Sequence, residues 1–201
     1  MYKLLLCWRY LRSIARLPVV GTMLASSLGC SVQTVHPLSE AGQVTRDSGL
    51  VGEWTHIDTD FPDSNMKVIV SKDRYGYLIV EDKKERPVRL SGKLIAIGED
   101  RYLELISDGT ENDSVAVLDT KVPAYLFVRI ERNDDRLTVW RPKFGKLKDA
   151  VSNGSLTGVV THSRVILTSP AEHIVEYLQA NRQLAFDKPV VYQRFVDKDA
   201  Q

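Results

Sequence analysis

The sequence predicts a mainly β domain, an antiparallel meander forming a small barrel or a sandwich, with a short helix and a C-terminal helix packed on the sheet. Short runs rich in Val, Ile, Leu and Tyr recur between residues 50 and 141, each bounded by Gly, Asp, Asn or Lys. Turn signals at such short, regular intervals are typical of up-and-down β architectures. Two helical patterns follow the main group of strands. The length of 201 residues, with 43% hydrophobic and 26% charged residues, suits one globular domain.

Strands are expected wherever such a run lies between two turn signals. The clearest hairpin joins residues 124–131 to 136–141 through Asn133-Asp134-Asp135, which tolerate turn conformations. The polar stretch 107–123 is either a surface loop or a ragged edge strand. The expected strands are 50–57, 66–70, 76–81, 88–97, 101–106, 124–131, 136–141, 159–161, 164–167 and 190–195.

Two helices are expected near the C-terminus. Residues 143–151 place Phe144, Leu147 and Val151 at helical spacing. A longer helix is expected over 170–186, because Ser169 is a candidate N-cap, Pro170 suits the first helical position and Glu172 completes a capping box. Its apolar stripe should pack on the sheet.

The first thirty residues predict an export signal. Four basic residues and no acidic one precede an uncharged, mostly apolar run over residues 17–30, which closes on small residues. The run is too short for a bilayer, whose hydrocarbon core needs about 20 apolar residues.

The stretch Ser26-Ser27-Leu28-Gly29-Cys30 resembles the lipobox of bacterial lipoproteins, in a looser form, since Leu usually stands three residues before the cysteine. The resemblance implies cleavage before Cys30, acylation of its thiol with a fatty acid such as palmitate, and a membrane anchor. Ser31 after it implies the outer membrane, facing the periplasm, if the cell has two membranes. An ordinary signal peptide and an uncleaved anchor helix beginning near Leu4 are the alternatives. Three arginines and Pro18 disfavour the anchor helix.

The predicted organisation is a signal peptide over 1–29, a lipidated cysteine and flexible tether over 30–49, and a β-rich domain over 50–197. Residues 31–49 show no sustained periodicity, which is typical of a linker. Cys7 leaves with the signal peptide, so Cys30 would be the sole cysteine of the mature chain. No intramolecular disulfide is then possible.

The sequence Gly52-Glu53-Trp54 at the first strand resembles lipocalin-type barrels, in which the Trp closes one end. The resemblance covers three residues and implies a barrel with room for an apolar ligand. The alternative is that Trp54 packs in the core of some other β domain.

Charge disfavours a nucleic-acid partner. Removal of residues 1–29 takes four of the 27 basic residues and none of the 26 acidic ones, which leaves a net charge of −3. Aromatic residues interleaved with basic ones resemble a base-stacking platform, but at strand positions they more often pack in a core. The aromatic residues in question are Tyr75, Tyr77, Tyr102, Tyr125, Phe127 and Trp140.

No catalytic motif, metal-ligand cluster or cofactor-binding motif is found, so no enzyme activity, metal or cofactor is expected. The segment His56-Ile57-Asp58-Thr59-Asp60 offers a nitrogen and two carboxylates, which equally suit a strand end. A site that paired His56 or His162 with a carboxylate would favour an enzyme.

Three functional classes remain. The first, preferred, is a non-enzymatic envelope lipoprotein, anchored to the membrane at Cys30, that binds a small apolar ligand or an envelope protein. The second is an assembly subunit of a membrane complex, without a ligand pocket. The third is an envelope enzyme whose catalytic residues are scattered in the sequence. An apolar cavity of ~300 Å³ or more would favour a ligand, and a filled core with an exposed apolar patch would favour a partner.

Overall fold

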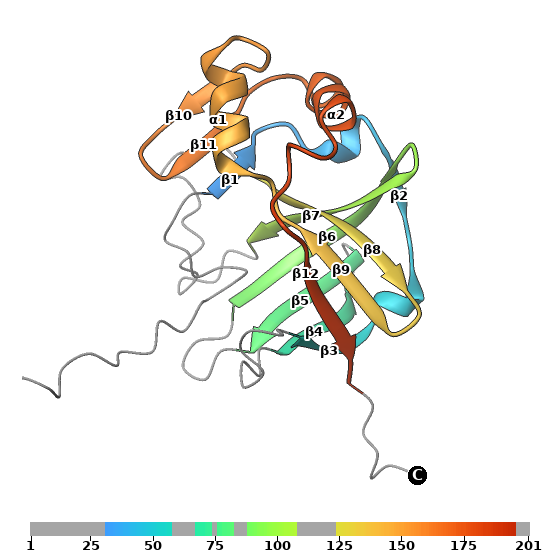
Figure 1. Ribbon diagram of the computed structural model, residues 1–201. Helices are drawn as coiled ribbons and strands as arrows, with labels where there is room; N and C mark the ends of the chain where they lie inside the picture. The colour runs from blue at the N-terminus through green and yellow to red at the C-terminus, as the bar shows by residue number, and fades with distance from the viewer. Residues whose placement is uncertain (1–30, 58–66, 74–75, 83–87, 108–123, 196–201) are drawn as a thin grey trace, which may run out of the picture.

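A computed structural model describes residues 31–57, 67–73, 76–82, 88–107 and 124–195. It contains twelve strands, two α-helices and two 3-10 helices (Figure 1). The strands are β1 Ser31–Thr34, β2 Gln43–Thr45, β3 Gly52–Ile57, β4 Lys67–Asp73, β5 Gly76–Asp82, β6 Val88–Ile97, β7 Asp100–Ser107, β8 Leu126–Asn133, β9 Arg136–Trp140, β10 Gly158–Val160, β11 Arg164–Leu167 and β12 Val190–Arg194. The helices are η1 Leu38–Glu40, η2 Ser48–Leu50, α1 Phe144–Ser152 and α2 Ala171–Ala180.

Eight strands close into an antiparallel barrel, which confirms the predicted fold class and gives a barrel rather than a sandwich. Their order is β6-β5-β4-β3-β12-β9-β8-β7, and β7 pairs again with β6. Strands β3 to β9 follow one another as a meander, and β12 closes the ring by pairing with both β3 and β9. The short β2 pairs with the end of β6 outside this ring.

Alternation along the barrel strands points one set of side chains inward. Trp54 lies opposite Val68 on one neighbouring strand and Arg194 on the other, so all three face the interior. The interior core comprises Leu50, Trp54, Val68, Val70, Tyr77, Ile79, Leu90, Leu94, Leu105, Val128, Ile130, Leu137, Val139 and Tyr192.

A second, three-stranded sheet stands beside the barrel. Its order is β1-β11-β10, with β1 parallel to β11 and β10 antiparallel to it. Two of its strands match runs expected from the sequence, but they do not join the main sheet. Figure 1 shows this sheet, α1 and α2 gathered along one side of the barrel, at the top of the view.

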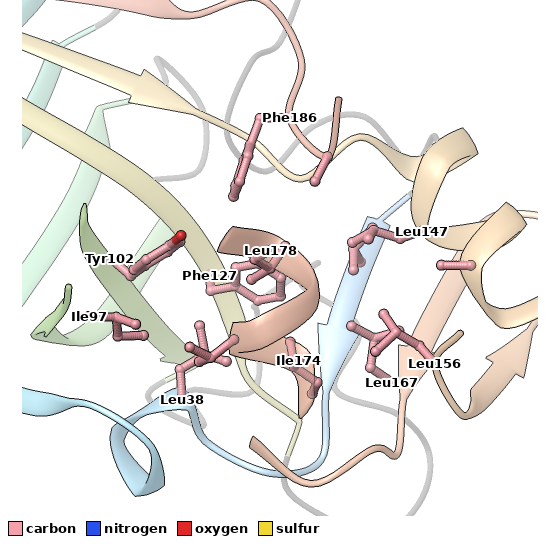
Figure 2. Close-up of a cluster of buried hydrophobic side chains, with 14 of the residues drawn as sticks. Leu38, Ile97, Tyr102, Phe127, Leu147, Leu156, Leu167, Ile174, Leu178 and Phe186 are labelled. Carbon is pink, nitrogen blue, oxygen red and sulfur yellow. The ribbon is translucent and has the colours of Figure 1, made fainter. Parts of the chain in front are cut away.

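A second hydrophobic core joins this unit to the outer face of the barrel. Phe127 and Tyr102 point outward from β8 and β7, and each is 1% exposed. In Figure 2, Leu178 and Ile174 of α2 lie between Tyr102 of the barrel and Leu147 of α1. Both helices therefore pack on β-structure through their apolar faces, as expected.

Residues 31–49 differ from the expected tether, because they are folded. Val32 and Leu38 are buried at 5% and 0% exposure. The Val35 amide donates to the Leu167 carbonyl, and the Ser31 amide donates to the Ser163 carbonyl. The folded part of the chain thus includes Ser31 and does not begin at Leu50. Each of these elements is only three or four residues long, so the local sequence shows no periodicity.

Helix α2 also differs from the expected 170–186. Pro170 occupies the N-cap position without a side-chain hydrogen bond. The buried Ser169 hydroxyl instead accepts from the Thr157 amide at 2.7 Å, which satisfies it across the neighbouring loop. The helix ends at Ala180, and the chain then turns Ala185 and Phe186 into the second core.

Candidate ligand-binding site

The barrel interior contains a cavity of about 50 Å³. Its walls come from η2 and from seven of the eight barrel strands, and they consist of aliphatic side chains and two tyrosines. Because water is poorly held where so few polar partners exist, such a space favours apolar contents. The lining residues are Leu50, Val68, Val70, Tyr77, Ile79, Leu90, Leu103, Leu105, Val128, Ile130, Leu137, Val139 and Tyr192.

Trp54 is buried in the barrel interior, near the end of the barrel where η2 lies. The ring is fully buried, and its Nε1 donates to the Leu50 carbonyl at 2.9 Å. The Arg194 guanidinium lies 4.5 Å from the ring centroid and donates to the carbonyls of Val51 and Gly49. A cation over an indole face is attractive. The last barrel strand therefore fixes the first strand and η2 to each other.

Asp47, at the start of η2, holds η2 against three strands of the barrel. Its carboxylate accepts from Arg101 at 2.9 Å and from Arg132 at 3.1 Å, on strands β7 and β8. The Gly49 amide donates to its other oxygen at 2.9 Å. The Asp47 amide donates to the Tyr77 hydroxyl at 2.6 Å. We call Asp47, Arg101, Arg132 and Tyr77 the cap cluster.

The cap cluster holds Asp47 in its charged form. Burial raises the pKa of this carboxyl, but hydrogen bonds from Arg132 and Gly49, the charge of Arg132 and a hydrogen bond from Arg101 outweigh burial and leave the pKa below its ordinary value. The hydrogen bond between Arg132 and Asp47 also raises the pKa of the Arg132 guanidinium. Sequence reasoning missed this cluster because Asp47 lay in the expected tether. The pattern Asp47-Ser48-Gly49, which is typical of an Asx turn, was the available signal.

The other predicted site residues are not brought together. His56 lies on β3 with its ring 5.6 Å from that of Tyr192, whereas His162 lies in the exposed turn between β10 and β11. Asp58, Asp60 and Cys30 fall outside the described residues, as do Tyr75 and the stretch 108–123. Within the described ranges, no three His, Cys, Asp or Glu side chains are grouped as metal ligands.

Four of the six aromatic residues of the suspected stacking platform pack in or against the two cores. Tyr77, Tyr102 and Phe127 are buried at 3%, 1% and 1% exposure. Trp140 packs at the margin of the second core with the Arg129 guanidinium 4.2 Å from its ring centroid. These side chains support the core interpretation.

Comparisons with protein-family models, with curated proteins and with solved structures give no match for this chain. None of the helices in the described part is long and apolar enough to cross a bilayer.

Proposed function

We propose that this chain is a non-enzymatic cell-envelope lipoprotein, anchored through Cys30, whose barrel binds a small apolar ligand. The observation that carries the ligand proposal is the apolar cavity inside the barrel. Two tyrosines line the cavity, and the hydroxyl of one of them, Tyr77, is already hydrogen-bonded to the backbone of Asp47. A charged ligand would find no partner in this lining and would lose its hydration.

The cavity limits the size of the ligand. At about 50 Å³ it is below the ~300 Å³ that would favour a ligand by size alone, so binding requires the interior to expand. The ligand is therefore small or slender, such as a hydrocarbon chain, and it enters as aliphatic side chains change rotamer.

Binding of a fluorescent alkyl probe tests the ligand proposal. Val128→Trp should fill the cavity and abolish binding, whereas Leu105→Ala should enlarge it and strengthen binding of bulkier probes. Val44→Trp adds a tryptophan at a position that is 54% exposed and should leave binding unchanged. Equal affinities in all the folded variants, checked by circular dichroism, would exclude the interior as the site.

The anchor proposal rests on the lipobox-like stretch before Cys30 and on the basic, then apolar, residues ahead of it. It implies export and, in a cell with two membranes, attachment to the outer membrane facing the periplasm. Radiolabelled palmitate should enter the wild-type protein but not Cys30→Ala, and equal labelling of both would refute the anchor.

The barrel's outer wall favours a second candidate, binding of an envelope protein. Ile57 is 42% exposed and pairs with Val191, while Ile69 is 37% exposed and pairs with Val80. Exposed apolar side chains on neighbouring strands suit a partner surface. Ile69→Lys should abolish co-purification of such a partner and leave probe binding intact.

A further inference from the structure

Ser31, the residue that follows the proposed anchor, already belongs to a strand. The Ser31 amide donates to the Ser163 carbonyl at 2.8 Å, and Ser31 lies opposite Arg164 in the parallel pair of β1 and β11. The next residues, Val32, Gln33 and Thr34, are 5%, 4% and 0% exposed. Backbone pairing and burial therefore hold β1 along its whole length.

Because Ser31 is already paired in a strand, no flexible linker separates a lipid on Cys30 from the domain. Consecutive Cα atoms are ~3.8 Å apart, so Cys30 lies within one residue of the sheet. A flexible linker of about 20 residues would instead allow a separation of ~25 Å.

The surface around Ser31 suits a phospholipid headgroup layer. Thr161 and His162 are exposed in the adjoining turn between β10 and β11. Arg164 is partly exposed beside Ser31, and its guanidinium has no carboxylate partner among the described residues. A basic side chain at a membrane surface is attracted by anionic lipid headgroups.

We propose that the lipid on Cys30 holds the β1-β11-β10 sheet directly against the bilayer, with residues 161–164 at the headgroups. This orientation rests on the proposed anchor. Thr34 forms a bridge with Tyr125, immediately before β8. Because four residues span at most ~14 Å, the start of this barrel strand also lies close to the membrane surface. An apolar ligand dissolved in the bilayer would then have a short path to the barrel.

Fluorescence quenching in vesicles tests this orientation. The full chain, processed and lipidated, is placed in phosphatidylcholine–phosphatidylglycerol vesicles that carry headgroup nitroxide quenchers. A thiol-reactive dye is attached at His162→Cys, or at Arg136→Cys as the control, because Arg136 is exposed at the start of β9, at the Trp54 end of the barrel. The lipid on Cys30 blocks the only other thiol of the mature chain.

The dye at position 162 should be quenched several-fold more than the dye at position 136. Insertion of twenty Gly and Ser residues between Cys30 and Ser31 should remove this difference, because the domain could then tumble. Equal quenching of both dyes in a protein that does carry the lipid would refute the proposed orientation but not the proposed lipid anchor. If mass spectrometry finds no lipid on Cys30, both the anchor proposal and the orientation proposal are refuted.

Discussion

Replacement of Asp47 by Asn tests whether the cap cluster stabilises the barrel. The amide can still accept from Gly49, but it loses the charge that faces Arg101 and Arg132. The three side chains are 13%, 33% and 25% exposed, so solvent weakens the interaction only in part. Hydrogen bonds to charged groups contribute ~1.5–3 kcal/mol each, and partial exposure lowers the combined loss to about 2 kcal/mol.

Urea unfolding and thermal melting at pH 7 measure this loss, which corresponds to a fall in Tm of about 4–8 °C. Since the pKa of Asp47 is below its ordinary value of 3.8, the stabilisation is present above that pH and is lost as the pH falls through the lowered pKa. The stabilities of wild type and Asp47→Asn should therefore converge as the pH falls below 3.8. Glu99→Gln, an exposed acid changed to an amide in the turn after β6, is the control. Equal urea midpoints for the two variants at pH 7 would refute the reasoning.

Three further changes test other parts of the fold. Burial raises the pKa of Tyr102 from 10.0 to about 12. Ionisation of Tyr102 should therefore lower the free energy of unfolding by roughly 3 kcal/mol between pH 10 and 12. Alkaline denaturation should show that Tyr102→Phe lacks this contribution. The same variant should be no less stable at pH 7, since the hydroxyl has no hydrogen-bond partner among the described residues. Arg194→Ala should cost about 2–3 kcal/mol in urea unfolding and raise the exposure of Trp54 to acrylamide, whereas an unchanged Stern–Volmer slope would contradict its role. Gly76→Ala should lower Tm by several degrees, because φ is +131° there and a Cβ would lie 2.7 Å from the Gly92 carbonyl oxygen.

The barrel strands could be predicted because their signals are local. Alternating side chains and turn residues such as Asn133-Asp134-Asp135 mark each hairpin within about a dozen residues. In the structure Asp134 does adopt φ +48°, which Asp tolerates. The prediction that residues 190–195 pair back into the sheet is confirmed by β12.

The first part of the folded chain could not be predicted because its contacts are distant in sequence. Val32 and Leu38 enter a core built by residues that follow them by more than fifty positions, and β1 pairs with β11. Asp47 meets Arg101 and Arg132 across 54 and 85 positions. Of the candidate site, the sequence singles out only Trp54, and the cavity depends on how all the strands pack.

Closure of the barrel by β12 makes the order of synthesis matter. The first barrel strand, β3, has no partner on one side until residues 190–194 arrive, and β9 waits for the same segment. An unpaired strand edge is a template for pairing between chains. A chain cut before Val190 would expose two such edges, so we expect it to aggregate. If the chain is exported as we propose, β3 would need protection, for example by a chaperone, until residues 190–194 have also crossed the membrane.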